Sequence, residues 1–449
     1  MENKNYELMV NGNLKRTICI LAIPAIISML VTALYNAADT YFVSKLGESA
    51  VAGVSVVMSY MSVVQACGFF FGHGSGNFIS QSLGKKDNLS TEKMAVTGVL
   101  YSFLAGLILM VLSLVFIDPI CSLFSSKTML AHTKNYFLFV VLATPFMTSS
   151  FTLNNQLRFQ GNAFYGMFGL GTGAVLNIIL DPILISVTGD VRGASLATMI
   201  SQIVGFILLF AFTFNKKSVR LKLKRISFEK LYIAEITKGG MPSLIRQGMM
   251  AIASACLSLM VKGYGDFAVA GVSIASKISW IFFSILIGFC QGFQPVCGFN
   301  YGAGRIDRVK KAFWFSTAVV TAYMIIACAV CLIFPSSLVE LFNTAGNTVG
   351  MEKAVAVAKN TLIYQALAFP LGGLYTMSSM MMQNIRRPIR ASILAMMRQG
   401  IAYIPCVLLL PSFCGLTGVM LSQTVADIVS FVVCLPILIS VLKELSVGK

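Results

Sequence analysis

The chain has 449 residues, of which 57% are hydrophobic and only 11% are charged, and its mean hydropathy is +0.81. Soluble domains carry about 25% charged residues, so this composition excludes an ordinary soluble protein and indicates a chain that lies mostly in lipid. The formal net charge of +17 comes mainly from the segments between long apolar runs. It is therefore interpreted as a signal of membrane topology, and we expect no nucleic-acid partner.

Long apolar runs recur along almost the whole chain, and a membrane-spanning helix needs roughly 20 mainly apolar residues. The polar segment Met1–Arg16 leads directly into the first run, without the small-residue cleavage site of a signal peptide. Such uninterrupted runs are too long for barrel strands, and helices satisfy the backbone in lipid. The sequence predicts an all-α polytopic membrane protein with spans at 17–43, 54–80, 94–117, 135–157, 166–187, 193–214, 239–261, 272–299, 312–334, 361–382, 391–413 and 415–441.

Lysine and arginine indicate the orientation, because cytoplasmic loops are enriched in both. An even number of spans puts the two termini on one side, together with loops 83–93, 158–165, 215–238, 300–311 and 383–390. That side holds 24 of the 34 basic residues, the opposite loops hold 7, and the spans hold 3, which are Arg246, Lys277 and Arg398. We therefore expect a multi-pass protein of a bacterial inner (cytoplasmic) membrane with both termini in the cytoplasm.

The chain contains an internal repeat. Ala50–Ser55 reads AVAGVS, and Ala268–Ser273 reads the same, 218 positions later. At this offset other glycines and prolines coincide in pairs, namely Pro24 with Pro242, Gly74 with Gly292, and Gly84 with Gly302. An even number of spans per half makes the repeats parallel. The predicted organisation is two pseudo-symmetric six-helix bundles, 1–215 and 239–449, joined by a basic cytoplasmic linker, 216–238.

Three acidic residues lie within predicted spans: Asp39, Asp181 and Asp427. A charge at the bilayer centre costs roughly 2.5–3.5 kcal/mol, so such a residue marks an ion or substrate pathway unless it is a neutral or hydrogen-bonded packing group. Counting 1.5 Å per residue from the outer ends of their spans, Asp39 and Asp181 lie roughly 9–14 Å below the outer surface. Their common depth predicts that they belong to one site.

One pocket in the outer half of the first bundle is therefore expected to hold a carboxylate pair and neighbouring polar groups, which are Tyr35, Asp39, Asn177, Asp181 and Thr198. Asn177 and Asp181 are four residues apart and share a helix face. Two close carboxylates cannot both ionise cheaply in a low dielectric, which predicts a proton site. Oxygen atoms from Asp39, Asn177, Asp181 and Thr198 also suit Na⁺. The residue types do not choose between H⁺ and Na⁺, and neither requires a cofactor.

Three segments of the chain carry a specific resemblance: Tyr35–Thr40 (YNAADT), Asn177–Pro182 (NIILDP) and Arg192–Thr198 (RGASLAT). With them the chain resembles the multidrug and toxic compound extrusion (MATE) family, nearest its bacterial MepA-like and DinF-like branch. The resemblance implies two six-helix bundles around a central cleft and export of small, mostly cationic organic compounds or drugs against entering H⁺ or Na⁺. It also implies that the matching polar positions form the cation-coupling site, in a protein that we expect to be monomeric.

The second bundle differs chemically from the first. Asp181 has no acidic counterpart there, because Cys406 stands at the corresponding offset of 225. Arg246 and Arg398 lie about seven residues inside their spans and are interpreted as snorkelling towards the interface. Asp427 is interpreted either as part of a structural ion pair or as a contact for substrate. The run Met380–Met382 is interpreted as lipid-facing packing, with an adaptable binding wall as the alternative. The candidate substrate-binding residues are Tyr136, Asn154, Gln291, Gln294, Arg398 and Asp427.

Two other classes of function are compatible with parts of the sequence. A flippase for a lipid-linked sugar or a peptidoglycan precursor would share the architecture and would need basic groups in the cavity for a diphosphate. Arg246, Lys277 and Arg398 favour this alternative, whereas Asp39 and Asp181 oppose it. An enzyme is not expected, because the sequence has no Ser/His/Asp grouping, HExxH motif or metal-ligand cluster. Without a P-loop, transport is expected to be secondary.

Overall fold

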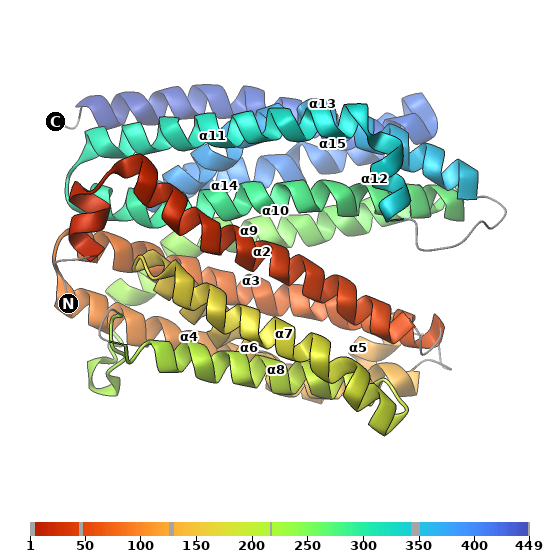
Figure 1. The fold of residues 1–449 in the computed structure, drawn as a ribbon, viewed down its shortest axis with the longest axis horizontal. Coiled ribbons are helices and arrows are strands. Elements are labelled where there is room, and N and C mark those ends of the chain that lie inside the picture. The colour runs from red at the N-terminus through yellow and green to blue at the C-terminus, as the bar shows by residue number, and fades with distance from the viewer. Residues whose placement is uncertain (1–4, 45–47, 125–129, 216–217, 343–350, 448–449) are drawn as a thin grey trace.

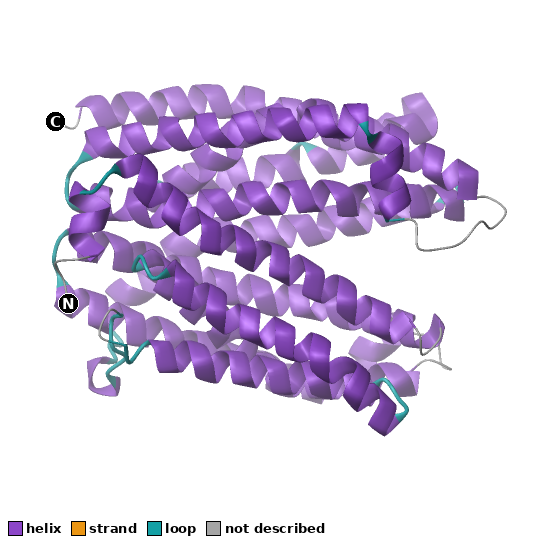
Figure 2. Ribbon diagram, in the orientation of Figure 1, coloured by secondary structure: helices purple, strands orange, loops and turns teal. Residues whose placement is uncertain are grey.

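The computed structural model describes residues 5–44, 48–124, 130–215, 218–342 and 351–447, but not the side chains at 33–56, 123–132, 351 and 447. Within these residues the chain is helical and contains no strand (Figure 2). The first half contains η1 (Glu7–Asn11), α2 (Leu14–Ser44), α3 (Glu48–Gly84), α4 (Asn88–Val115), α5 (Ile117–Phe124), α6 (Leu130–Phe159), α7 (Ala163–Thr188) and α8 (Arg192–Phe212). The second half contains η2 (Leu223–Arg225), α9 (Lys230–Lys262), α10 (Asp266–Gly302), α11 (Ile306–Ile333), α12 (Pro335–Leu341), α13 (Met351–Asn384), α14 (Pro388–Met396), η3 (Met397–Ile401) and α15 (Tyr403–Val447).

Twelve of these helical segments make the spans, as the apolar runs predict. Ten segments in the described part of the chain are long and apolar enough to cross a membrane. The longest, Pro388–Ser446, has 59 residues and is broken at Gly415, where φ is 55°, so it supplies two spans. Glycine suits this break because a side chain is strained at positive φ. Helix α3, with 37 residues, completes the set. The all-α fold of two pseudo-symmetric bundles is confirmed.

The helices form two groups, one from each half of the chain (Figure 1). Helices α2–α8 make the lower group in this view and α9–α15 the upper group. The two groups lie together at the left, where both termini lie, and diverge towards the right, where α5 and α12 lie. We call the left-hand end the basic end, since the loops 83–93, 215–238, 300–311 and 383–390 belong to it. The two halves therefore meet most closely at the basic end.

The segment between the halves is shorter than predicted and packs on α4. Helix α9 begins at Lys230, inside the predicted linker 216–238. Just before it, Glu229 accepts a hydrogen bond from Lys93 of α4 at 2.9 Å, and this bond holds the pKa of Glu229 below its usual range. Lys222 forms a second ion pair with Glu92 of α4, at 2.7 Å. The connection is thus attached to the first half by exposed ion pairs.

Small residues bring the two halves into backbone contact at the basic end. A Cβ at Gly84 of α3 would clash with the carbonyl of Phe299 in α10, and a Cβ at Gly302 of α10 would clash with the carbonyl of Gln81 in α3. Gly84 and Gly302 are equivalent in the repeat, and so are Gln81 and Phe299, since each pair is 218 positions apart. The crossing of α3 and α10 is therefore two-fold pseudo-symmetric, and we call this contact the glycine seam.

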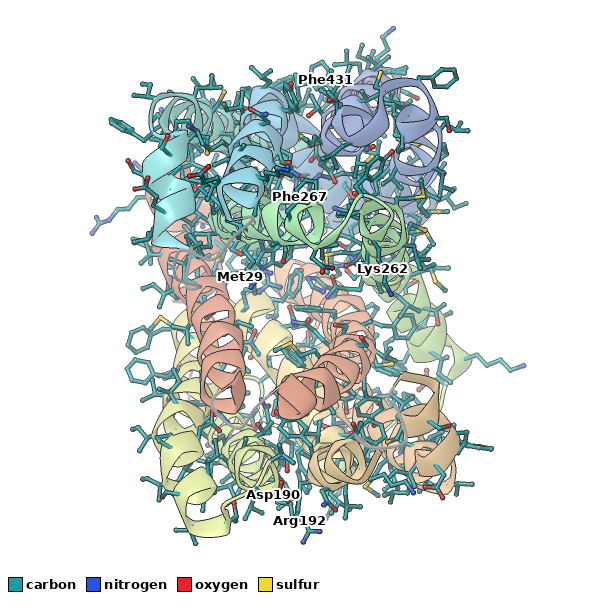
Figure 3. The ribbon with its side chains drawn as sticks, turned by 90° about the vertical axis from the view of Figure 1, so that its right-hand side faces the viewer. Met29, Asp190, Arg192, Lys262, Phe267 and Phe431 are labelled. Carbon is teal, nitrogen blue, oxygen red and sulfur yellow. The ribbon has the colours of Figure 1, made fainter. Side chains whose placement is uncertain are left out.

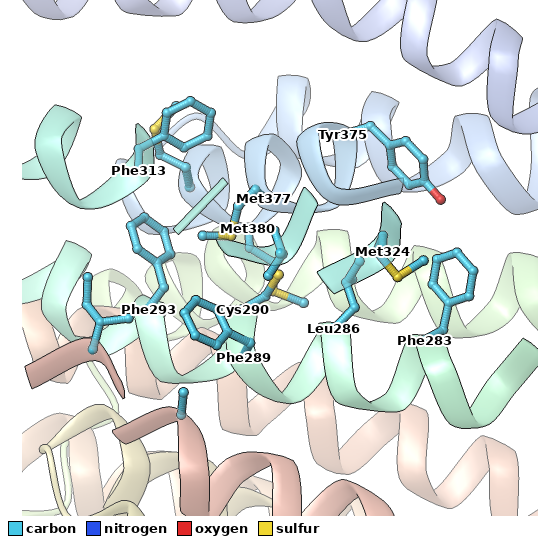
Figure 4. Close-up of a cluster of buried hydrophobic side chains, with 14 of the residues drawn as sticks. Phe283, Leu286, Phe289, Cys290, Phe293, Phe313, Met324, Tyr375, Met377 and Met380 are labelled. Carbon is cyan, nitrogen blue, oxygen red and sulfur yellow. The ribbon is translucent and has the colours of Figure 1, made fainter. Parts of the chain in front are cut away.

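The second half has a large core rich in methionine and phenylalanine, built from α10, α11 and α13 (Figure 4). Met377, Met380, Met381 and Met382 are at most 1% exposed. The interpretation of Met380–Met382 as lipid-facing is therefore wrong. Helix α13 packs against α10, α11, α14 and α15, so the helix that carries these methionines has neighbours on several sides.

Candidate functional site

Three polar side chains meet between α7 and α8, as their spacing predicts. The Nδ2 of Asn177 lies 3.3 Å from Oδ1 of Asp181 and 3.3 Å from Oγ1 of Thr198. Asn177 and Thr198 are 1% exposed, and Asp181 is fully buried. Asn177 and Asp181 are one helical turn apart on α7, and Thr198 comes from the second turn of α8. We call these three residues the acidic cluster.

The other two members of the predicted pocket, Tyr35 and Asp39, lie on α2. Their side chains are outside the described part of the structure, so their place in the pocket stays a prediction. The backbone of α2 packs against α7, which carries Asp181. Helix α2 thus runs beside the helix that holds the acidic cluster.

The acidic cluster offers oxygen atoms of three kinds: a carboxylate, an amide carbonyl and a hydroxyl. These are ligands that Na⁺ accepts, and a buried carboxylate is equally able to take a proton. In the described part of the chain, no three His, Cys, Asp or Glu residues lie together in a way that could hold a metal ion. With oxygen atoms alone, the acidic cluster has the type of donor set that hard cations prefer.

The two weaker candidates of the first half lie at different depths. Tyr136 is 1% exposed and belongs to an apolar cluster with Val191 and Ala194, at the N-terminal end of α8 near Thr198. Asn154 packs against Gly166 of α7. Gly166 precedes Asn177 by eleven residues, which is roughly 16 Å along a helix. The structure thus brings Tyr136 towards the acidic cluster and separates Asn154 from it.

A second polar cluster, centred on Arg158, was not anticipated from the sequence. The sequence placed Arg158 on a cytoplasmic loop, but it lies inside α6 and is only 3% exposed. Its Nη1 donates to the carbonyl of Gln291 and to Oε1 of Gln294, both at 2.8 Å, and both residues belong to α10. Its Nη2 donates to Oδ1 of Asn155 and lies 3.3 Å from Nε2 of His73. Arg158 therefore ties the first half to the second.

The predicted substrate-binding residues Gln291 and Gln294 thus accept hydrogen bonds from an arginine of the opposite half. Gln291 is also within 3.8 Å of the sulfur of Met29 on α2. Viewed from the end opposite the basic end, Met29 lies at the boundary between the two groups of helices (Figure 3). Side chains with nitrogen and oxygen atoms occupy the band beside it. We call Arg158 and its partners His73, Asn155, Gln291 and Gln294 the arginine cluster, and it lies where the two halves meet.

Arg398 and Asp427 form an ion pair inside the second half. Nε of Arg398 lies 3.0 Å from Oδ1 of Asp427, and Nε2 of Gln423 donates to the same oxygen at 2.9 Å. The guanidinium stacks over the ring of Phe283, 3.8 Å from its centroid. The interpretation of Arg398 as a snorkelling residue is therefore wrong, because the guanidinium turns inward to a carboxylate that is 1% exposed. The predicted ion pair of Asp427 is therefore present in the structure, and its partner is Arg398.

Arg246 lies on α9 and is partly exposed, so its interpretation as a snorkelling residue stays a prediction. Lys277 of α10 is exposed and belongs to neither cluster. A polar run within the fourth span could have revealed the arginine cluster, since it contains Thr148, Ser149, Ser150, Thr152, Asn154, Asn155 and Gln156.

Known proteins agree with this architecture. The MatE family model matches residues 24–183 and 242–408, one range in each half of the repeat. Multidrug export protein MepA of Staphylococcus haemolyticus (strain JCSC1435) is 29% identical over 433 residues, which cover 95% of this chain and 94% of that protein. A crystal structure of MATE in complex with MaL6 aligns with a TM-score of 0.93 at 22% identity, over 99% of both chains. An outward-facing multidrug resistance MATE family transporter of the MOP superfamily aligns with a TM-score of 0.92 at 24% identity, again over 99% of both chains. The chain belongs to the MatE (MATE) family of membrane transporters.

Proposed function

We propose that the protein is a secondary active exporter of lipophilic, mostly cationic compounds, driven by the entry of H⁺, with Na⁺ as the alternative ion. The observation that carries this proposal is the acidic cluster in a membrane-spanning bundle, where the amide of Asn177 donates to the buried carboxylate of Asp181 and to the hydroxyl of Thr198. The name of the relative from Staphylococcus haemolyticus, a multidrug export protein, supports the choice of drugs as substrates. No cofactor is needed beyond the coupling ion.

The distribution of basic residues supports an orientation in the inner membrane with the basic end and both termini in the cytoplasm. Helix α7 then ends at Thr188 on the outer side, seven residues after Asp181. Asp181 thus lies roughly 10 Å below the outer end of its helix. An ion from outside would travel only this distance to reach the carboxylate. The protein is proposed to work as a monomer.

The arrangement of the halves supports alternating access. We propose that the units 1–215 and 239–449 rock about the basic end, with 216–238 as their connection. An ionised carboxylate is costly in the membrane, so Asp181 is stabilised by a proton, by Na⁺ or by a cationic substrate. Competition between the ion and the drug for this charge would couple the entry of one to the exit of the other. Asp39 is proposed as the second carboxylate of this site.

The test is transport in proteoliposomes that contain the purified protein, with ethidium as the substrate and an imposed pH or Na⁺ gradient. Asp181→Asn should abolish gradient-driven export, and Asp39→Asn should do the same. Asp118→Asn is the matched control, because Asp118 is an exposed acid of the same half, with a side chain 70% exposed. Protein abundance is measured beside transport, since a buried substitution also affects folding. Full export by both Asp181→Asn and Asp39→Asn would refute the coupling role.

A flippase for a lipid-linked sugar or a peptidoglycan precursor is the second candidate. One observation favours it: the buried guanidinium of Arg158 lies at the boundary of the halves, and neither Arg158 nor Arg246 forms an ion pair with a carboxylate of the described residues. Fixed positive charge of this kind is what a diphosphate requires. Transport of a lipid diphosphate without transport of ethidium, and with greater loss in Arg246→Gln than in Asp181→Asn, would favour the flippase.

A further inference from the structure

Two cavities meet at the basic end, where α14 packs beside α9. The first is a polar pocket of about 240 Å³, lined by α3 of the first half and, in the second half, by α9 and the turn between α13 and α14. The second is a groove of about 420 Å³ between α9 and α14. Lys238 and Pro388 line both cavities, so the pocket and the groove adjoin at these two residues.

The polar pocket contains a buried amide whose hydrogen bonds are unmade. Asn77 of α3 lines the pocket and is 3% exposed, and neither its Oδ1 nor its Nδ2 has a hydrogen-bond partner. The neighbouring amide of Gln81, in contrast, donates to the carbonyl of Asn384 at 2.6 Å. A buried amide without partners loses its hydration and gains nothing in return. Asn77 therefore suits a ligand with hydroxyl groups, which both donate and accept.

The charged groups of the pocket leave one positive charge over. Nη2 of Arg386 lies 3.1 Å from Oε2 of Glu235, so these two charges offset each other. Lys238 is exposed and forms no ion pair with a carboxylate of the described residues. The unmatched ammonium thus stands where the pocket meets the groove, and it complements a group with a single negative charge. The pocket is also smaller than sites for drug-sized ligands, which measure about 300–1,000 Å³.

The groove is mainly apolar and open to the surroundings. Besides Lys238 and Pro388, its lining consists of Thr237, Met241, Ile389, Ser392, Ile393 and Met396. Ile389 is 74% exposed and Ile393 is 38% exposed. Lys238 directly precedes the apolar span predicted at 239–261, which places its ammonium at the level of lipid headgroups. From Ile389 to Met396 the groove follows α14 for roughly 10 Å into the apolar layer, as an acyl chain would.

We propose that the pocket and the groove together bind one molecule of phosphatidylglycerol from the leaflet at the basic end. Its phosphodiester lies against Lys238, its glycerol headgroup reaches Asn77, and one acyl chain fills the groove. Basic pockets between membrane-spanning helices are typical sites for anionic headgroups. The headgroup contacts α3 of one half and α9 of the other, so the bound lipid links the halves beside the glycine seam. The proposal goes beyond export and depends on neither the coupling ion nor the exported compound.

The first test is lipid binding to the purified full-length protein, measured by native mass spectrometry with dioctanoyl phosphatidylglycerol. Lys238→Gln should raise the Kd roughly fivefold, because it removes the unmatched charge. Ser392→Phe should also raise the Kd, since it fills the groove without changing a charge. Lys230→Gln is the matched control: it removes an exposed lysine from the start of the same helix, and Lys230 lines neither cavity. Equal weakening by Lys230→Gln and Lys238→Gln would overturn the proposal.

A second test concerns the headgroup. Dioctanoyl phosphatidylmethanol has the same phosphodiester charge but no hydroxyl group, so the wild type should bind it severalfold more weakly than phosphatidylglycerol. Asn77→Ala should bind the two lipids alike. Equal affinity of the wild type for both would overturn the assignment of the headgroup to Asn77, and equal affinity for phosphatidylethanolamine would overturn the role of the charge. Equally tight binding of soluble glycerophosphoglycerol, which has no acyl chain, would show that the ligand is not a lipid.

Discussion

Nε of Arg398 lies 3.0 Å from Oδ1 of Asp427, and this buried ion pair belongs to the half in which Cys406 stands at the position equivalent to Asp181. The two halves share a helical framework but place their charges differently. In the first half the structure describes a buried carboxylate that accepts a hydrogen bond from the amide of Asn177, whereas in the second half the carboxylate is matched by a guanidinium. The carboxylate of the second half is thus held by a fixed charge.

Removing one member of this pair should destabilise the protein more than removing both. Asp427→Asn leaves a buried guanidinium without its counter-charge, and breaking a buried pair in this way costs about 3–5 kcal/mol. Arg398→Gln should have a similar but smaller effect, since the Arg398 side chain is 17% exposed. The double variant carries two neutral amides and should recover much of the melting temperature of the purified protein. Additive losses in the two single variants and the double variant would contradict this.

The glycine seam should be sensitive to any added side chain. Gly302→Val would drive a side chain into the carbonyl of Gln81, so we expect the basic end to separate or the protein to lose stability, at about 1–3 kcal/mol. Spin labels on cysteines at Lys85 and Lys311 would report a longer or broader distance. Gly248→Val is the control, because a Cβ at Gly248 meets no atom within 4 Å. An unchanged distance and melting temperature in Gly302→Val would argue against a tight seam.

Thr198→Val tests the acidic cluster without touching a charge. Valine keeps the shape of threonine but removes the hydroxyl that accepts from Asn177, so the folding free energy should fall by about 1 kcal/mol. If the hydroxyl also binds the coupling ion, gradient-driven ethidium export should fall severalfold. Thr198→Ser keeps the hydroxyl and should export nearly as well as the wild type. Equal transport by Thr198→Val and the wild type would remove Thr198 from the site.

The orientation can be measured at Lys224. This residue lies in the exposed turn η2 between the halves. A cysteine at Lys224, in a background without other reactive thiols, should resist an impermeant thiol reagent added to intact cells and react after the membrane is opened. The nearby Ser218 is 1% exposed and would be a poor site for such a label. Rapid labelling of Lys224→Cys in intact cells would reverse the proposed topology.

Local patterns account for what the sequence predicts well. Apolar runs long enough for a bilayer mark the spans, and the gap predicted between 413 and 415 coincides with the backbone break at Gly415. The spacing of Asn177 and Asp181 places both on one face of a helix, and the shared depth of Thr198 brings it to them. Each of these inferences needs only helix geometry and the thickness of a membrane.

Long-range contacts account for what it misses. Arg158 stands at the end of an apolar run and next to a loop, so its sequence neighbourhood resembles that of a surface residue. Two of its acceptors, on Gln291 and Gln294 of α10, lie more than 130 residues away in the sequence. Helix α6 is 72% buried over its apolar window, and a helix so enclosed has to satisfy its polar residues with other helices. The prediction that Met380–Met382 face lipid fails in the same way, because periodicity does not show which neighbours surround a helix.

The glycine seam allows the sequences of the two halves to diverge in evolution. At Gly84 and Gly302 a glycine meets a main-chain carbonyl, so these two contacts require a small residue and do not depend on the side chain of the partner residue. The two halves can accumulate different chemistry, as Asp181 and Cys406 show, while they still dock in the same way. A chimera that combines one half of this chain with the complementary half of a relative should assemble wherever those small residues are retained.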